Sequence, residues 1–464
     1  MKTFKYIFFI CAIGLVLNGC EDRLDIVPKG EITLSKTADL ELLLNQEYNL
    51  RTNVGADLGM LCNTNVSAFN SVVDILANKQ YFVYSCLTYD ETIDRPSICL
   101  NDTRYEAIYK YINNMNTVIA KAPGTDGSEK LKVQIEAEAR VMRAYLHFLL
   151  VNIHAAQYDE ATLQNKGGIP YVDNIDLGIE KTKNTLSEVY EKILADCDDR
   201  YINVLPDHNS DCCRGDRGFA NAVRAMVLFQ MKKYSDAIPY AVEALNLRSK
   251  IDDRSIVKEQ GMWTITQTDE SNYVYMKGSS SPISPGGLLL SYETKALLDP
   301  DDYLLKYDHS CWDEFMGEMM GGLSGTYICA NYNVMQNSYG IRTEQIYYLL
   351  GEALIRTGQI DEGLEEIDKV RRLRIENCQP FSGHVSSEVE AMELLRNAKQ
   401  IEMIGSYQTF FDTKRWNTEP QYKRVITRNL GLYGQYSISP DSPLWILPFP
   451  ASATRINKSL TQNF

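Results

Sequence analysis

Apolar residues recur at helical spacing along much of the chain after residue 102. Between residues 129 and 154 they follow one another at intervals of four and seven, at Leu131, Ile135, Met142, Leu149 and Ile153. This spacing places them on one face of an α-helix. Another helix is predicted to begin at residues 185–188, Thr-Leu-Ser-Glu, because a threonine three residues before a glutamate forms a capping box. The pattern predicts a mainly α fold.

Two later stretches, 225–245 and 351–373, resemble each other after a shift of 126 residues, which places Leu228 on Leu354 and Ala237 on Gly363. Each predicts a helix, a tight polar turn and a second helix that begins with a small residue, where two helices approach closely. This is the tetratricopeptide pattern, whose units bury their apolar faces against neighbours. We therefore predict tetratricopeptide-like helices over about 101–248 and 342–406.

Two regions, about 53–100 and 249–340, lack sustained helical spacing. They are rich in glycine, serine, asparagine and aromatic residues. Long irregular stretches inside a compact domain are usually functional. We expect them to be inserted loops that bind a ligand.

The N-terminus predicts a lipid anchor. Lys2 and Lys5 precede an apolar stretch over 6–17 that is too short to cross a bilayer, and Gly19-Cys20 follows. This order is typical of a bacterial lipoprotein signal peptide over 1–19, with Cys20 as the acylated residue. Residues 20–30 then form a lipidated tether, and 31–464 form the folded domain. The alternatives are an ordinary signal peptide and an uncleaved anchor.

The composition is that of a globular protein and limits which classes of partner can bind. The hydrophobic share of 44% and the charged share of 23% are ordinary for a globular protein, and the net charge of -14 argues against nucleic acid as a partner. Beyond Cys11 and Cys20, nine cysteines remain, without Cys-x-x-Cys pairs, and we expect most to be buried thiols. Whether any of them pair stays open: Cys62, Cys86, Cys99, Cys197, Cys212, Cys213, Cys311, Cys329 and Cys378.

No catalytic motif is present, since zinc-helix, phosphate-loop, nucleophile-elbow and dinucleotide-binding signatures are all missing. His147 and His154, seven residues apart on one predicted helix, are interpreted as core residues. Four aspartates could bind calcium but lack the spacing of a known loop, so an acidic turn is favoured: Asp299, Asp301, Asp302 and Asp308. We predict no enzyme, no cofactor and no metal centre. A carboxylate pair of a glycosidase stays open, because such partners meet only in the fold.

Motifs spread along the chain resemble those of the SusD/RagB family of outer-membrane lipoproteins. They are Tyr-Glu-Ala-Ile-Tyr at 105–109 with Ile112 and Asn116, Glu-Ala-Arg-Val-Met-Arg-Ala-Tyr at 138–145, Gly-Gly-Ile-Pro at 167–170, Arg342 and Glu344 with 347–354, Phe411-Asp412-x-x-Arg415-Trp416, and Leu-Pro-Phe-Pro at 447–450. One departure is the segment 397–403, Asn-Ala-Lys-Gln-Ile-Glu-Met, where the family usually has Glu-Arg-x-x-Glu-Leu. We interpret it as a change of helix-surface charge more than of function, and as a sign of a divergent branch whose ligand the motifs do not predict.

This resemblance implies a SusD-like helical platform with inserted ligand loops, lipid-anchored on the cell surface at the outer membrane. It implies that the protein binds oligosaccharides and delivers them to a SusC-like TonB-dependent transporter, for which it is the hinged lid. Three alternatives stay open: the same role for peptides, as in RagB-type relatives, a lipid-anchored hydrolase, and a tetratricopeptide scaffold without a small ligand.

The family's ligand contacts vary, so no motif identifies them here. Because flat aromatic faces stack on sugar rings, we expect exposed rings from the irregular regions to meet in one cleft: Trp263, Tyr273, Tyr275, Trp312, Tyr327 and Tyr332, joined by Tyr84 and Tyr89. For any one ring, the alternative is that it anchors its own loop on the helices. The charged signature residues are expected to form buried or capping ion pairs: Arg140, Arg143, Asp412 and Arg415.

Overall fold

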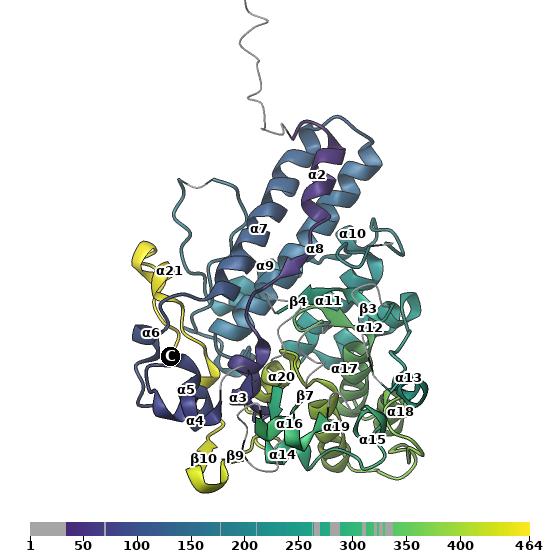
Figure 1. The fold of residues 1–464 in the computed structure, drawn as a ribbon. Helices are drawn as coiled ribbons and strands as arrows, with labels where there is room; N and C mark the ends of the chain where they lie inside the picture. The colour runs from purple at the N-terminus through teal and green to yellow at the C-terminus, as the bar shows by residue number, and fades with distance from the viewer. Residues whose placement is uncertain are drawn as a thin grey trace, which may run out of the picture.

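A computed structural model describes residues 34–464, except for residues 69–70, 177, 210, 262, 264–269, 279–287, 309–311, 320–322, 324–327 and 330–336. The predicted signal peptide (1–19), Cys20 and the tether to residue 30 lie outside the described residues. Figure 1 shows that helices form most of the molecule, with short strands between them.

Long helices form the body of the protein and confirm the predicted fold class. Consecutive helices pack as pairs, α7 on α8, α11 on α12 and α17 on α18, and α12 also packs on α17, so that neighbouring pairs stack. Their bounds are Thr103–Lys121 (α7), Glu129–His154 (α8), Arg217–Gln230 (α11), Tyr234–Leu247 (α12), Thr343–Arg356 (α17) and Ile360–Arg371 (α18). The helix predicted over 129–154 is confirmed with those ends.

Further helices complete the body. The capping box predicted at Thr185 is present, with the Thr185 hydroxyl accepting from the main-chain amide of Glu188. In Figure 1, α2 lies beside α7 and α8 at the top of the view, while α21 lies at the opposite side from α12 and α18. The bounds are Thr37–Leu44 (α2), Leu186–Asp196 (α9), Asp199–Ile202 (α10), Glu388–Glu402 (α19), Gln408–Trp416 (α20) and Ala451–Ile456 (α21).

The two hairpins predicted to be repeats share their turn as well as their helices. Lys232, between α11 and α12, has a φ of 62°, and Gly358, at the equivalent position between α17 and α18, has a φ of 87°. In both hairpins the chain therefore turns at the same position, through a residue in the left-handed backbone conformation. Where α17 and α18 pack together, Gly351 of α17 lies close to Gly363 of α18. A Cβ on Gly363 would lie 2.5 Å from the Gly351 carbonyl oxygen.

Short elements fill the two regions predicted to be irregular. Their helices are α3 (Leu58–Leu61), α4 (Val72–Ala77), α5 (Phe82–Thr88), α6 (Arg95–Ile98), α13 (Val257–Gln260), α14 (Tyr292–Lys295), α15 (Tyr303–Tyr307) and α16 (Glu314–Met319). An antiparallel sheet of order β2-β5-β7-β6 joins the two regions, because β2 comes from the first and the other strands from the second. Its strands are Asn65–Ala68 (β2), Leu288–Leu290 (β5), Ile328–Cys329 (β7) and Trp312–Asp313 (β6).

Three smaller strand pairs connect distant parts of the chain. The pair of β1 and β4 is parallel, whereas β3 with β8 and β9 with β10 are antiparallel. Their bounds are Tyr48–Asn49 (β1), Met276–Lys277 (β4), Asn272–Val274 (β3), Ile341–Arg342 (β8), Ile426–Asn429 (β9) and Gln435–Ile438 (β10). Within the described part of the chain, none of the helices combines the length and the apolar character needed to span a membrane.

The predicted ion pairs of the signature residues are present. Arg143, on α8, donates from Nε to Asp196 on α9 at 2.6 Å, and both side chains are buried. Arg140 is half-buried and pairs with Glu136 at 2.8 Å. Arg415 donates to Asp412 at 2.9 Å, with both groups in the core. Arg140 also reaches Asp196 at 3.3 Å, so both arginines of α8 join it to α9, and Arg415 joins α20 to α17 through Glu352 at 2.6 Å. The predicted role in holding helices in place is confirmed for these arginines.

The described cysteines are free thiols. Cys62, Cys86, Cys197 and Cys213 are buried, while Cys99, Cys212 and Cys378 are half-buried. Cys311 and the side chain of Cys329 lie outside the described residues. Burial raises the pKa of the Cys62 thiol to about 12, so that this thiol stays protonated at neutral pH.

His147 is a core residue, as interpreted from the sequence. Its Nδ1 lies 2.9 Å from the Arg143 carbonyl oxygen, and its Nε2 accepts from the Val172 amide at 3.0 Å. The ring also stacks on Tyr171, with 3.8 Å between ring centroids. Both nitrogens are thus used by the neutral imidazole, and burial lowers the pKa of His147 to about 3. His154 is likewise buried, and burial lowers its pKa to about 4.

We expect Gly363→Ala to destabilise the fold. Alanine inside a helix normally stabilises by up to about 1 kcal/mol, but here the added Cβ would meet the Gly351 carbonyl. Overpacking of this kind costs about 1–3 kcal/mol, which urea denaturation measures. The control is Gly124→Ala, whose Cβ would meet nothing within 4 Å. Equal stability of the two variants would contradict the close helix crossing.

We also expect His147 to make the fold acid-sensitive. The pKa of an unfolded histidine is about 6.5, so the unfolded chain binds this proton first as the pH falls. The contribution of neutral His147 to the free energy of unfolding is complete above about pH 6.5. It is lost progressively as the pH falls toward the folded-state pKa of about 3. In His147→Gln the loss of unfolding free energy between pH 6.5 and 4.5 should be shallower than in wild type, by up to about 1.4 kcal/mol per pH unit. His384→Gln, at an exposed position, is the matched control.

Candidate functional site

Four of the aromatic residues expected to be exposed are buried, so that expectation is wrong for them. Trp263, Tyr273, Tyr275 and Tyr89 have exposed fractions of 2%, 1%, 6% and 5%. Trp263 donates from Nε1 to Asp252 at 2.9 Å, and the Tyr273 hydroxyl donates to the Arg248 carbonyl at 2.7 Å. Their rings fill the core while their polar atoms find partners there, so they anchor the loops on the helical body.

The other expected ligand residues are placed differently. Tyr84, on α5, is half-buried, and the Lys79 ammonium lies 5.7 Å from its ring centroid. The main chain of Trp312 forms part of β6, but its side chain lies outside the described residues. Tyr327 and Tyr332 lie outside them entirely. Of the five side chains that the structure describes, only Tyr84 is partly exposed, so these five do not form the expected cleft of exposed rings.

The four aspartates weighed as a calcium site act as turn and helix partners. Asp302 caps α15 by accepting from the Leu304 amide at 2.8 Å, and Asp308 accepts from the Trp263 amide at 2.9 Å. Asp301 pairs with Lys306 at 3.0 Å. Within the described residues, these aspartates do not form a group of three oxygen ligands close enough to share an ion.

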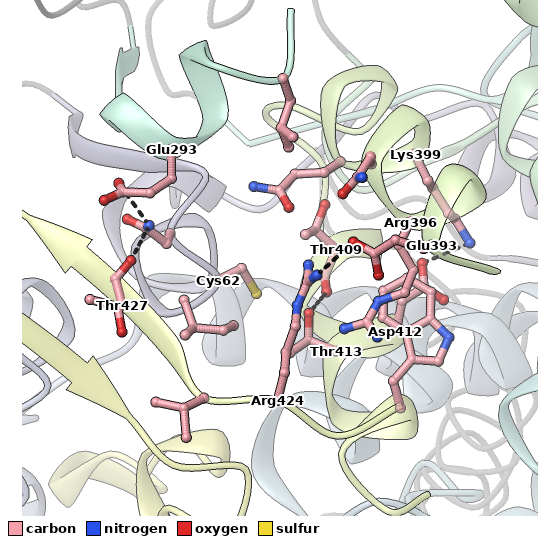
Figure 2. A pocket seen from close by; sticks show the side chains of 17 residues that line it. Cys62, Glu293, Glu393, Arg396, Lys399, Thr409, Asp412, Thr413, Arg424 and Thr427 are labelled. Atoms are coloured by element: carbon pink, nitrogen blue, oxygen red, sulfur yellow. Dashed lines mark hydrogen bonds and ion pairs between the residues drawn. The ribbon is translucent and has the colours of Figure 1, made fainter. Parts of the chain in front are cut away.

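A cavity of about 370 Å³ lies among polar and charged side chains (Figure 2). Its walls come from α19, α20, α14, the turn after α3 and the start of β9. The lining residues are Cys62, Asn63, Glu293, Leu297, Glu393, Arg396, Asn397, Lys399, Gln400, Thr409, Asp412, Thr413, Trp416, Arg424, Val425, Ile426 and Thr427. This cavity is the candidate site.

A chain of buried charges forms the floor of the cavity. Arg415, on α20, donates to Glu352 of α17 at 2.6 Å and to Asp412 at 2.9 Å. Lys399, on α19, pairs with the other oxygen of Asp412 at 2.7 Å. Burial opposes the charge of Glu352, but Arg415 beside it lowers the pKa of this carboxyl to about 2. Glu352 is therefore a carboxylate at neutral pH, held in place by Arg415.

Arg396 lies on the α19 wall and is 6% exposed. Its guanidinium carbon lies 4.6 Å from the ring centroid of Trp416, and its Nη1 donates to the Tyr422 carbonyl at 2.8 Å. Burial, and secondly the nearby Arg424, lower the pKa of Arg396 to about 10, so it stays a cation at neutral pH. Because Arg396 covers the Trp416 ring, this ring is not free to stack on a ligand.

The mouth of the cavity is more open. Arg424 reaches from the segment before β9 toward Glu393 on α19, at 3.4 Å (Figure 2), and both side chains are exposed. On the opposite wall, Glu293 accepts from the Asn63 side-chain amide and from the Asn429 main-chain amide, each at 3.0 Å. The cavity thus offers hydrogen-bond donors, amides and charges, which suit the binding of a polar ligand.

Sequence reasoning missed this cavity, although one signal pointed to it. Asn397, Lys399 and Gln400 line it, and they lie in the segment 397–403 that departs from the usual family motif. The departure was interpreted as a change of helix-surface charge. The structure instead turns part of it inward, because α20 packs across α19 at this point and encloses the space between them.

Comparison with known families assigns the chain. Residues 24–223 match a family model described as "Starch-binding associating with outer membrane", and residues 327–464 match a model described as "SusD family". The chain belongs to the SusD/RagB family. The whole candidate site except Cys62, Asn63, Glu293 and Leu297 lies within the second matched segment. No curated protein matches the chain.

Solved structures share the SusD-like fold over nearly the whole chain. A SusD superfamily protein from Bacteroides thetaiotaomicron VPI-5482 is similar with a TM-score of 0.71 and 17% identity, covering 92% of this chain and 100% of that one. A putative sugar binding protein from Bacteroides vulgatus ATCC 8482 has a TM-score of 0.69 and 14% identity, covering 93% and 99%. A SusD-like carbohydrate binding protein from the same organism has a TM-score of 0.64 and 14% identity, covering 92% and 97%.

Proposed function

We propose that this protein binds oligosaccharides at the cell surface and passes them to a SusC-like TonB-dependent transporter, acting as its hinged lid. Cys20 would hold it to the outer membrane by acyl chains. Membership of the SusD/RagB family carries this proposal, together with the similarity to a putative sugar binding protein and to a SusD-like carbohydrate binding protein. The described residues lend support through a rigid helical body from which two loop regions project and share one sheet.

The loop regions offer exposed apolar side chains that a packed helical body does not need. On α16, Phe315 is 72% exposed and Met319 is 61% exposed; in the first region, Tyr81 is 44% exposed. Aromatic rings stack on the apolar faces of sugar rings, and a rigid platform limits the entropy lost on binding. We propose Phe315 as a stacking residue, in the region where Trp263 and Tyr273 were expected to play this role.

We expect Phe315→Ala to weaken oligosaccharide binding roughly tenfold, the loss typical of a buried interface contact. The best ligand from a glycan array would be measured by calorimetry against wild type and variant. The melting temperature should stay unchanged, because the ring is exposed. Phe464→Ala, at an exposed aromatic residue outside the loops, is the control. Full affinity in Phe315→Ala would remove this residue from the site, and binding to peptides but to no glycan would overturn the sugar proposal.

We expect the wild-type protein, purified through a C-terminal tag from detergent-solubilised outer membranes, to bring down a much larger β-barrel transporter. Cys20→Ala should be released from membranes when the transporter gene is deleted, because stable anchoring requires the acyl chains. Recovery of the wild-type protein alone, in detergents that preserve such complexes, would contradict the partner. Sedimentation of Cys20→Ala with membranes in the deletion strain would contradict the anchor.

A further inference from the structure

A buried cation, Arg396, lines the candidate cavity. Every lining carboxylate already has a partner: Asp412 pairs with Lys399 and Arg415, Glu393 with Arg424, and Glu293 accepts two hydrogen bonds. Within the described part of the chain, Arg396 forms no ion pair, and its hydrogen bond goes to the neutral Tyr422 carbonyl. Glu393 and Glu352 favour the charge of Arg396 from a distance, but neither forms an ion pair with it, so the guanidinium can pair with an anion that enters the cavity.

Burying an unpaired charge is costly, because the group loses its hydration. The Trp416 ring beneath Arg396 offsets part of this cost through a cation–π contact. Four buried polar atoms of lining residues lack a hydrogen-bond partner among the described residues: Nε of Arg396, Nζ of Lys399, Oγ1 of Thr409 and Oδ2 of Asp412. Lys399 and Asp412 still form an ion pair with each other. Nε of Arg396 and the Thr409 hydroxyl, on adjoining helices, can each donate to a ligand oxygen.

The second arginine lies at the mouth of the same cavity. Arg424 faces the space between α19 and α20 (Figure 2), and its pair with Glu393 is long and exposed. Exposed pairs of this kind contribute about 0–1 kcal/mol, so a ligand anion can displace Glu393 at little cost. Because guanidinium groups present planar forks of N–H donors, they match carboxylate and sulfate oxygens.

We propose that this cavity binds an oxyanion, the carboxylate or sulfate group of an acidic sugar, with Arg396 at its base and Arg424 at its mouth. A volume of about 370 Å³ is within the range of small-ligand sites. Asn397 lines the same cavity and offers its amide group to ring hydroxyls, whereas the Gln400 amide already donates to the Thr294 hydroxyl at 2.8 Å. The identity of the ligand as a sugar rests on the proposed function, whereas the binding of an oxyanion does not.

The first test is calorimetric titration of the whole mature protein with sodium sulfate, in buffers matched with sodium chloride for ionic strength. We expect saturable sulfate binding to wild type that weakens roughly tenfold or more in Arg396→Gln, since a charged hydrogen-bonded contact is lost. Arg372→Gln is the matched control, because this arginine pairs with Glu365 on the exposed face of α18. Wild-type affinity in Arg396→Gln would overturn the proposal.

Arg396→Gln could disturb packing against Trp416, so a second variant is needed. Arg424→Gln removes the exposed charge at the mouth and should weaken sulfate binding without changing the melting temperature. Crystals of the wild-type protein soaked in sodium selenate give an independent position for the anion. An anomalous selenium peak between Arg396 and Arg424 supports the site, and peaks elsewhere with none in the cavity would overturn it.

To identify the kind of molecule that carries the oxyanion, sodium glucuronate and glucose are titrated under the same conditions as sodium sulfate. Glucuronate binding that depends on Arg396, with no binding of glucose, supports an acidic sugar. Sulfate binding without glucuronate binding would overturn the sugar part and leave a site for a free inorganic anion. Conversely, tight binding of neutral oligosaccharides that is unaffected by Arg396→Gln, without sulfate binding, would overturn this inference and leave the proposed function standing.

Discussion

The buried ion pair between Arg415 and Glu352 is the contact on which the C-terminal half of the fold depends. It joins α20 to α17 in the core, and Asp412 and Lys399 extend it to α19. Trp416 adds a hydrogen bond from Nε1 to Glu352 at 2.9 Å. Removing one partner of such a cluster leaves an uncompensated buried charge, which costs about 3–5 kcal/mol. These charges therefore set the positions of α17, α19 and α20, and with them the shape of the cavity.

A second cluster of charges holds the long insertion between α12 and α17 on this body. Glu402, on α19, accepts from Arg342 at 2.8 Å, from Arg374 at 2.7 Å and from Arg254 at 3.1 Å. Arg254 also lies over the Trp263 ring, 4.7 Å from its centroid. The aromatic residues at the base of the insertion are thus used for anchoring. Phe315, on α16 of the same insertion, is by contrast 72% exposed.

In the proposed function, the cavity and the two loop regions would contact different parts of a ligand. The fold is shared with proteins of 14–17% identity, so most side chains differ while the helices keep their places. Arg396 is an example of such a side chain. The helix α19 sets its position, whereas the charge that it brings to the cavity depends on the residue type alone. A common platform can therefore present different ligand sites, and an oxyanion site would be one particular solution.

The sequence by itself determined the helical body. The period of apolar residues over 129–154, the capping box at Thr185 and the small residues Ala237 and Gly363 all predict local structure, because each acts over a few residues of chain. The family motifs likewise predicted that Arg143, Asp412 and Arg415 form ion pairs. Only the tertiary structure decided which aromatic rings are buried and that, among the described residues, Arg396 forms no ion pair. Both depend on which residues, distant in sequence, surround a side chain in the fold. The spacing of residues along the chain does not predict these neighbours.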